Sequence, residues 1–537
     1  MNPIETLNTL IGSVAWPTLR GVLHVTFFLV VLYLLKVMLW DQRGATGLRH
    51  LPKAKRIVGP AIAALVVLFG AALAYQASWQ LAGVTRPRFI AFMQTYDRRQ
   101  FNPAHGIERG RILDSQGEVL AFSALRDGRS KRVYPYGPAF AHVVGYTDAR
   151  YGAAGMEAAA NAHLNGSTPV DLKAWGQLGR QVLTRDRHPK GQDLVLTLDT
   201  ELQLMAARAL GERRGAVVML RPGDGAIRVL LSTPGYDPNA VTGALFQGRD
   251  PAAPLLSRAT QGLYPPGSTF KVVVAAEALN AGFRGTLPCP ADGFTTSARY
   301  PKIRDHEYYS ARRRGQTWRG HGSLDLSKAL AESSNVFFAQ LGDRLGHDAF
   351  HDTLDRFQFN RELPLHEGLF GAQTMQTGRI RRIARSDRYG LAQAAIGQGR
   401  VLTTPAQMAL VAATVANGGL MVRPRLVVSD QPKALGRPLG AADAARLGRM
   451  MRRVVSEGTG RGIDTEGLAI AGKTGTAQNP GGKSHSWFIG YAPAGSRERH
   501  AGLAVAVLVE EGGYGSATAA PIARDLLVQA HSRGMLR

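Results

Sequence analysis

The chain has 537 residues, enough for two or three domains and a large hydrophobic core. Its 45% hydrophobic and 20% charged residues are ordinary for a folded protein and exclude a mainly disordered chain. The formal net charge of +25 suits an anionic partner, but there is no zinc-finger spacing and no aromatic RNA-binding signature, so we expect no nucleic acid partner. A solvated basic surface and an attraction to anionic lipid or polymer both stay open. The single cysteine, Cys289, rules out a disulfide within the chain, and the scattered histidines predict no metal site.

Two apolar runs near the N-terminus predict a membrane anchor over residues 1–80. Residues 21–40 and 57–75 are each long enough to cross a bilayer core as a helix. The segment between them, 41–56, carries five positively charged residues, whereas the stretch before the first run carries one. The positive-inside rule therefore places the short loop in the cytoplasm and both ends of the hairpin, including the N-terminus, outside. A cleaved signal peptide is the alternative for the first run, but the sequence after it is a poor cleavage site.

Residues 81–190 combine short strand-like pieces with glycine turns, which is too little for a second large catalytic domain. We interpret this segment as a small pedestal outside the membrane. The rest of the chain is more regular, with a hairpin over 215–232, a mostly helical middle over 268–460, three strands between 467 and 509 and a last helix. Strands at both ends with helices between them predict an α+β domain over 191–537, an antiparallel sheet assembled from distant segments and flanked by a helical lobe.

One stretch of the last strands raises the question of nucleotide binding. Residues 467–474, GLAIAGKT, fit the phosphate-loop pattern G-x-x-x-x-G-K-[ST]. A phosphate loop needs a flexible turn and then a helix whose N-terminus faces the anion. Here the middle residues favour a strand, and Thr-Gly-Thr-Ala-Gln-Asn-Pro-Gly-Gly follows Lys473, which cannot open a helix. The context indicates a strand that ends in Lys-Thr-Gly-Thr.

A second motif, Ser-Thr-Phe-Lys, begins at Ser268. Two prolines and a glycine precede it and Gly282 ends the apolar run, which predicts a buried helix of about 14 residues beginning at the serine. Ser268 and Lys271 then lie on one helix face. A serine hydroxyl is a weak nucleophile that needs a neighbouring base, and an amine can serve if burial and nearby positive charge lower its pKa. Taken alone, the motif is also compatible with an N-cap serine and a surface lysine.

The third motif is Ser333-Ser334-Asn335, at the end of a helical segment. We expect the Ser333 hydroxyl to relay a proton between the lysine pair and the attacking or leaving amine. We expect Asn335 to hydrogen-bond both Lys271 and a backbone amide of the substrate. A polar helix end would explain the same residues.

Lys473, Thr474, Gly475 and Thr476 complete the set on the C-terminal strand. The Lys473 charge suits a substrate carboxylate and is expected to keep the amine of the Ser-Thr-Phe-Lys motif deprotonated. Gly475 lets a substrate backbone lie close to the strand edge. The N–H of Thr476 can pair with that of Ser268 as an oxyanion hole, and we place Thr474 with them in the substrate-binding set.

In this order and these contexts, the three motifs resemble those of the class B penicillin-binding proteins, the monofunctional transpeptidases of peptidoglycan synthesis. The resemblance implies a penicillin-binding/serine β-lactamase-like fold, with a five-stranded antiparallel sheet and a central helix, on an extracytoplasmic pedestal of the dimerisation type. It also implies the bacterial inner membrane, with the catalytic domain in the periplasm. The likeness covers most of residues 105–537, and further matching stretches lie at 110–121, 151–166, 215–239, 397–419, 454–463 and 485–493.

The resemblance also implies a reaction. Ser268 attacks the carbonyl between the two terminal D-alanines of a donor stem peptide, Lys271 takes the proton, and D-alanine leaves. An amine of the diamino acid on a neighbouring stem then resolves the acyl-enzyme into a cross-link. β-Lactams imitate the D-alanyl-D-alanine end and acylate the same serine. No cofactor is implied, and the expected partners are the membrane and a polytopic glycan polymerase of the SEDS family.

The chain departs from the family pattern in having two predicted spans, a short pedestal, and arginine-rich stretches at 312–314 and 379–388 for which solvated surface is the simplest interpretation. The same motifs would also serve a D,D-carboxypeptidase or a β-lactamase. A β-lactam sensor and a catalytically silent cell-wall scaffold are the non-enzymatic alternatives. The loop 41–56 is too small for a sensor's effector domain, and a scaffold need not keep the polar residues of all three motifs, so we favour an enzyme.

Overall fold

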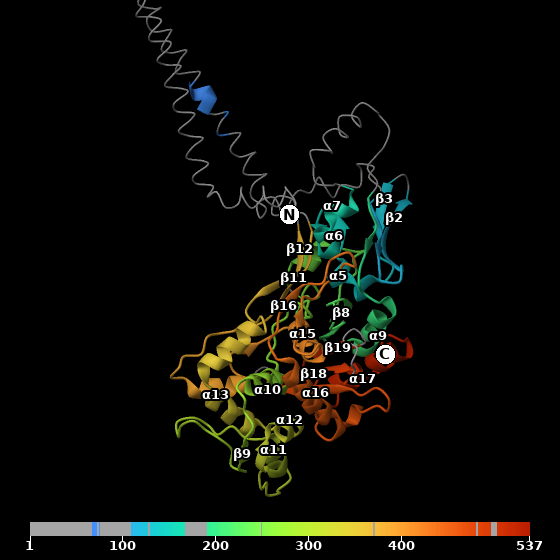
Figure 1. Cartoon of the computed structure of the whole chain (residues 1–537). Coiled ribbons are helices and arrows are strands. Elements are labelled where there is room, and N and C mark those ends of the chain that lie inside the picture. The colour runs from blue at the N-terminus through green and yellow to red at the C-terminus, as the bar shows by residue number, and fades with distance from the viewer. Residues whose placement is uncertain are drawn as a thin grey trace, which may run out of the picture. The chain divides into compact units, whose positions relative to one another are not determined.

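The structure is a computed structural model of the whole chain (Figure 1). The chain divides into two compact units, Met1–Ile90 and Ala91–Arg537. The expected span at 21–40 and most of that at 57–75 lie outside the described residues, so the anchor stays a prediction. Among the residues that are described, no helix is long and apolar enough to cross a membrane. The structure describes residues 67–71, 73, 75, 109–126, 129–166, 191–248, 250–368, 371–479, 482–495 and 502–536.

The pedestal is built on a small sheet with the strand order β3-β2-β1-β6. β1 pairs antiparallel with β2 and parallel with β6. Strand β6 comes after residue 190, the predicted end of the pedestal, so the sheet includes residues from beyond that boundary. Three short helices pack against one another, and an ion pair between Arg132 and Glu157 connects the second of them to β3. The bounds are β1 Ile112–Leu113, β2 Val119–Arg126, β3 Arg129–Val133, β4 Thr147–Asp148, β5 Gly152–Ala153, β6 Leu194–Val195, η4 Gly137–Ala139, α5 Ala141–Val144, α6 Gly155–Ala159 and α7 Asn161–Leu164.

A buried carboxylate joins the elements of the pedestal. Glu157 in α6 is fully buried, and its two oxygens lie 2.6 Å from Nε of Arg109 and 2.7 Å from Nε of Arg132. Burial acts to raise the pKa of Glu157, but the two guanidinium groups outweigh it and hold the pKa below its usual value. Arg109 precedes β1, Arg132 lies in β3 and Glu157 lies in α6. This charge cluster therefore connects separate elements of the pedestal.

The large domain is organised around a five-stranded antiparallel sheet in the order β17-β18-β19-β7-β8, as the resemblance implied. Its first two strands in the chain lie beside its last, so the sheet joins segments almost three hundred residues apart. Side chains alternate between two hydrophobic clusters, with Val218 and Ala506 on one face and Val217 and Val505 on the other. The strands are β7 Gly215–Leu220, β8 Ile227–Thr233, β17 Ala471–Ala477, β18 His485–Ala492 and β19 Leu503–Val509.

Helices cover both faces of this sheet (Figure 1). α9 Thr200–Leu210 and α17 Ala519–Ser532 pack on one face, where they form the second hydrophobic cluster with the sheet. α15 Pro405–Ala416 packs on the other face, and η6 Gly267–Phe270 packs against β17. The other helices are α10 Lys271–Asn280, α11 His306–Arg313, α12 Leu326–Glu332, α13 Asn335–Arg356, α14 Arg388–Ala395, α16 Ala441–Ser456, η5 Gly243–Phe246 and η7 Arg461–Ile463.

α10 is the central helix, buried along almost its whole length and packed against α13 and α16. The helical middle of the chain also contains short two-stranded sheets that the sequence pattern did not predict. Their strands are β9 Thr286–Cys289, β10 Gly322–Asp325, β11 Glu362–Glu367, β12 Ala372–Gln376, β13 Arg379–Ile380, β14 Val401–Leu402, β15 Met421–Val422 and β16 Ala434–Gly436.

Candidate active site

Ser268 lies on a tight turn that precedes the central helix. It belongs to the 3-10 segment η6. The α-helix α10 begins at Lys271, three residues later than the predicted start at the serine. Gly267 has a φ of 53°, which L side chains rarely adopt, and a Cβ at this position would lie 3.0 Å from the Thr476 carbonyl oxygen. The Pro-Pro-Gly sequence therefore brings the serine against strand β17, where it is half-buried.

Lys271 is fully buried and extends to the junction between α12 and α13. Its Nζ donates to the Ser333 carbonyl oxygen at 2.5 Å and to Asn335 Oδ1 at 2.8 Å, and lies 3.4 Å from Ser333 Oγ. The same Nζ lies 5.6 Å from the ring centroid of Phe338. The structure thus brings the lysine of the Ser-Thr-Phe-Lys motif into contact with both polar ends of the Ser-Ser-Asn motif.

The surroundings of Lys271 favour its neutral form. Burial removes the hydration of an ammonium and lowers the pKa of Lys271 to about 7, although Asp305 and Glu307 act in the opposite direction. A neutral amine has two N–H groups and one lone pair. The Ser333 carbonyl and the Asn335 amide take the two N–H groups, so the lone pair stays available to a hydroxyl proton. We expected the charge of Lys473 to depress this pKa, whereas burial is the main cause.

The Ser-Ser-Asn motif spans the sharp turn between two helices. Ser333 ends α12 in the left-handed conformation, with φ 60° and ψ 34°, which costs a non-glycine residue roughly 1 kcal/mol or more. Ser334 then caps α13 by accepting the N–H of Phe337 at 3.1 Å. The Asn335 Nδ2 donates to the Arg304 carbonyl oxygen at 3.0 Å, which turns Oδ1 toward the lysine amine.

The Lys-Thr-Gly-Thr motif forms the inner part of edge strand β17. Lys473 is fully buried, and its Nζ donates to the Thr474 carbonyl oxygen at 3.0 Å. Burial, together with the nearby charge of Lys271, lowers the pKa of Lys473 well below its usual value. Both lysines are fully buried. The Thr474 hydroxyl lies 2.8 Å from that of Thr459.

Close backbone packing explains the glycine of this motif. A Cβ on Gly475 would lie 2.8 Å from Cγ2 of Thr269 and 3.1 Å from the Pro266 carbonyl oxygen, so only glycine lets η6 approach the strand this closely. On the next residue, the Thr476 hydroxyl accepts the N–H of Gly515 at 3.3 Å. The segment after β19 thereby also contacts the motif strand.

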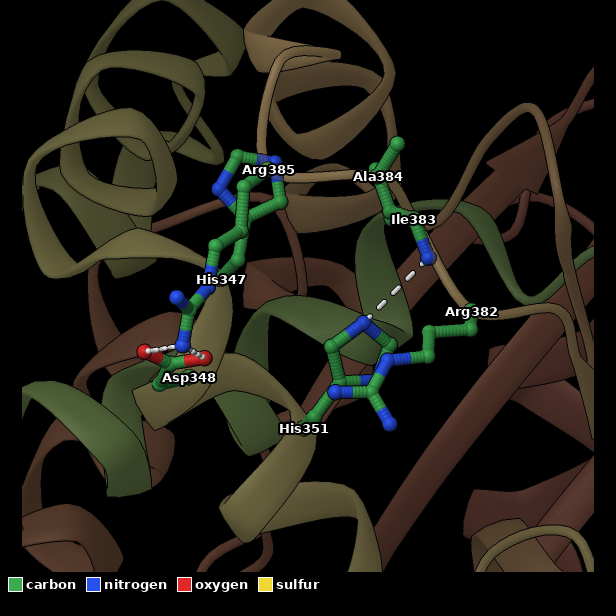
Figure 2. Close-up of a pocket in the computed structure, with 7 residues that line it drawn as sticks. All are labelled: His347, Asp348, His351, Arg382, Ile383, Ala384 and Arg385. Carbon is green, nitrogen blue, oxygen red and sulfur yellow. Dashed lines mark hydrogen bonds and ion pairs between the residues drawn. The ribbon is translucent and has the colours of Figure 1, made fainter.

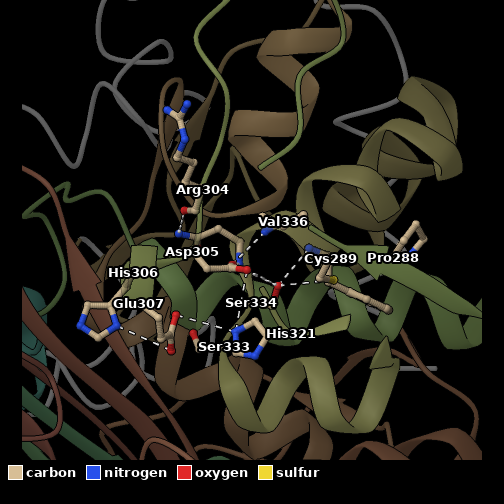
Figure 3. Close-up of polar contacts among 12 residues, drawn as sticks. Pro288, Cys289, Arg304, Asp305, His306, Glu307, His321, Ser333, Ser334 and Val336 are labelled. Carbon is tan, nitrogen blue, oxygen red and sulfur yellow. Dashed lines mark hydrogen bonds and ion pairs between the residues drawn. The ribbon is translucent and has the colours of Figure 1, made fainter. Parts of the chain in front are cut away.

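The sequence reasoning missed a group of polar residues on the chain between β9 and β10. Asp305 is buried and lies against the start of α13, and His321 lies 3.8 Å from Asp305 and 3.7 Å from Glu307 (Figure 3). Asp305 and His321 lie in non-helical backbone on either side of the short helix α11, which contains Glu307. The partners of Asp305 in α13 are about 30 positions away in the sequence. A single sequence carries no signal for such contacts.

A separate cavity of about 340 Å³ contains none of the motif residues (Figure 2). Two contacts lie in the wall of this cavity. Nε2 of His351 accepts the backbone N–H of Ile383 at 3.3 Å, and the Arg385 guanidinium forms an ion pair with Asp348 at 2.8 Å. The cavity lies between α13 and the arginine-rich stretch before α14, to which the sequence assigned no role. Among the described residues, no group of three or more His, Cys, Asp or Glu side chains could hold a metal ion.

Two sequence families match this chain. The penicillin-binding protein transpeptidase domain matches residues 215–528, and the penicillin-binding protein A dimerisation domain matches residues 109–193. The first match contains all three motifs and the whole five-stranded sheet. The chain therefore belongs to the penicillin-binding proteins with a transpeptidase domain, and its combination of domains is that of class B.

Individual relatives agree with this assignment. The peptidoglycan D,D-transpeptidase PbpA of Mycolicibacterium smegmatis is 34% identical over 463 residues, which cover 80% of this chain and 90% of that protein. MrdA of Acinetobacter baumannii, also a peptidoglycan D,D-transpeptidase, is 31% identical over 72% of this chain and 64% of its own length. The crystal structure of penicillin-binding protein A from Mycobacterium tuberculosis has a TM-score of 0.68 and 31% identity, covering 79% of this chain and 99% of that one. The imipenem acyl-enzyme of that protein has a TM-score of 0.66 at the same identity and the same coverage.

Proposed function

We propose that this chain is a peptidoglycan D,D-transpeptidase in which Ser268 is the acylated nucleophile and Lys271 its general base. The observation that carries the proposal is the buried amine of Lys271, whose two short bonds to Ser333 and Asn335 leave its lone pair for the proton of Ser268. Ser268 lies in η6, three residues before Lys271 at the start of α10, and this spacing favours both side chains on one side of the helical turn. The relatives named D,D-transpeptidases support the reaction class.

The reaction then proceeds in two half-reactions. The Ser268 oxygen forms a bond to the carbonyl carbon between the two terminal D-alanines, its proton passes to Lys271, and the bond to the last D-alanine breaks as that amine receives a proton. In the second half, an amine of the diamino acid on another stem attacks the ester carbonyl and loses a proton to the same base. The ester bond to Ser268 then breaks, and the serine oxygen takes that proton back. The Ser333 hydroxyl, 3.4 Å from the Lys271 amine, is close enough to carry the proton to and from the amines.

The Lys-Thr-Gly-Thr strand supplies the binding surface. We assign the N–H groups of Ser268 and Thr476 to the oxyanion, since Gly267 packs directly on the Thr476 carbonyl, and one such donor contributes roughly 10²–10³ in rate. Lys473 and Thr474 face the carboxylate end of the donor, and Gly475 keeps the strand edge open to its backbone. β-Lactams carry the same carboxylate beside a strained amide and acylate Ser268 by the first half-reaction.

We assign residues 1–80 to a hairpin anchor in the bacterial inner membrane, 81–190 to the pedestal and 191–537 to the transpeptidase domain. The two apolar runs and the basic loop between them support this topology, with the catalytic domain in the periplasm. A polytopic glycan polymerase of the SEDS family is the proposed membrane partner.

Labelling with a fluorescent penicillin tests the assignment of the nucleophile. Membranes that contain the full chain should show a covalent band, and the Ser268→Ala variant should show none. Ser532→Ala, which removes an exposed hydroxyl in α17, is the matched control and should label normally. A folded wild-type protein that takes no label would overturn the proposal. Incubation with lipid-linked glycan strands should give cross-linked dimers, and D-alanine release without dimers would indicate a carboxypeptidase.

A further inference from the structure

Asp305 lies at the start of α11, but its carboxylate binds the start of another helix, α13. It occupies the N-cap position of α11 but makes no capping hydrogen bond there. Instead its Oδ1 accepts the backbone N–H of Asn335 at 2.5 Å and that of Val336 at 3.0 Å. The Ser334 hydroxyl, which caps α13 itself, donates to the same carboxylate at 3.1 Å (Figure 3). One buried side chain thus binds three successive residues at the start of α13.

The energetic setting makes these contacts strong. Asp305 is 2% exposed, so its charge depends on protein donors rather than on water. Free N–H groups at a helix N-terminus attract an anion, and hydrogen bonds to a charged acceptor contribute about 1.5–3 kcal/mol. The second carboxylate oxygen, Oδ2, lies 3.8 Å from Nε2 of His321. The charge therefore fixes the first turn of α13 to the segment between β9 and β10.

This contact reaches the candidate base through one residue. Asn335 has its backbone N–H on Asp305 and its amide Nδ2 on the neighbouring Arg304 carbonyl, so both ends of the residue are held by two successive residues. The Oδ1 that remains accepts the Lys271 amine at 2.8 Å. A shift of Asp305 would move the acceptor that orients the base.

We infer that Asp305 is a positioning residue for the acylation step, because it fixes the backbone of Asn335, whose side chain accepts a hydrogen bond from the Lys271 amine. The inference rests on the proposed function. It assigns a task in the reaction to the chain between β9 and β10, outside the three sequence motifs. Asp305 itself touches neither the base nor the nucleophile through any contact in the described structure.

The charge of Asp305 also predicts a change in the pH dependence of acylation, which a simple loss of stability would not cause. Its negative charge acts to raise the pKa of Lys271, in the same sense as Glu307 and against burial. Lys473 on β17 is also near enough to interact with this amine, since burial and then the charge of Lys271 lower the pKa of Lys473. Removal of the Asp305 charge should therefore lower the pKa of Lys271 and shift the acid limb of the acylation rate to lower pH.

Two variants separate geometry from charge. Asp305→Ala removes every acceptor and should lower the acylation rate constant by roughly 10²-fold, the loss that a displacement of about 1 Å can cause at a catalytic group, with little change in noncovalent affinity. Asp305→Asn keeps an oxygen for the two backbone N–H groups but removes the charge. At high pH we expect Asp305→Asn to lose less of the acylation rate constant than Asp305→Ala does. We also expect its rate to fall off at a lower pH than that of the wild type. Both rate constants come from fluorescent penicillin labelling of the full chain over a concentration series.

The controls decide each outcome. Asp387→Ala removes the cap of α14, where Asp387 accepts the N–H of Gly390 at 2.8 Å, and should lower thermal stability without changing acylation. If Asp305→Ala does not fold, Asp305→Asn carries the test. Wild-type acylation in a folded Asp305→Ala, or an unmoved acid limb in Asp305→Asn, would overturn the inference while the Ser268 label persists. Loss of the wild-type label itself would instead refute the proposed function.

Discussion

The pH dependence of acylation tests the assignment of Lys271 as the base. Its amine is buried without a carboxylate partner in the described structure, and its pKa of about 7 follows from that burial. At one pH unit below that value only about a tenth of the amine is neutral, and at one unit above about nine tenths is. The acylation rate constant should therefore rise roughly tenfold between pH 6 and pH 8 and then level off.

The sign follows from the role of the group. A general base must be unprotonated, so the rate falls as the pH drops through the pKa of Lys271. Rate constants for fluorescent penicillin, measured by rapid quench at each pH, give the midpoint of the acid limb. Lys271→Arg is the matched variant, because a guanidinium stays charged throughout this range and should show little acylation at any pH. A wild-type midpoint above pH 9, near that of a solvated lysine, would refute the reasoning.

Two further predictions concern packing and stability. Gly475→Ala should reduce acylation at least tenfold, because its Cβ would press on Thr269 and force η6 away from β17, while such overpacking typically lowers stability by only about 1–3 kcal/mol. Acylation rates and thermal melts of the same variant check both parts, and a wild-type rate contradicts the first. Glu157→Gln should lower the free energy of unfolding of the pedestal by roughly 3–5 kcal/mol, since it leaves Arg109 and Arg132 buried without their anion. Because the folded pKa of Glu157 is lowered, this stabilisation is present above the unfolded pKa and is lost as the pH falls through the folded one. Urea unfolding near neutral pH measures the loss, and a change below about 1 kcal/mol would contradict it.

Sequence patterns predicted the parts of this protein that depend on local order along the chain. The strands of the large sheet were visible as apolar runs, and the motif that begins at Ser268 was visible as a Pro-Pro-Gly turn before an apolar helix. The left-handed backbone conformation of Ser333 could not be predicted from the sequence, because serine has no preference for it. The two helices that the turn joins impose this conformation. The contacts of Asp305 were not visible either, since they join an irregular segment to a helix about 30 residues away.

The placement of charge around Lys271 shows why these nonlocal contacts matter for the chemistry. A carboxylate in direct contact with the amine would stabilise the ammonium and remove the base at neutral pH. Asp305 is near enough to raise the pKa of Lys271, but its carboxylate accepts two backbone N–H groups of α13 and the Ser334 hydroxyl. A neutral amide, that of Asn335, takes the contact with the amine. Burial can then lower the pKa to about 7, while the nearby anion limits how far it falls. A base whose pKa lies close to the working pH is partly neutral and yet strong enough to accept the proton of a hydroxyl, which neither burial alone nor a direct ion pair would provide.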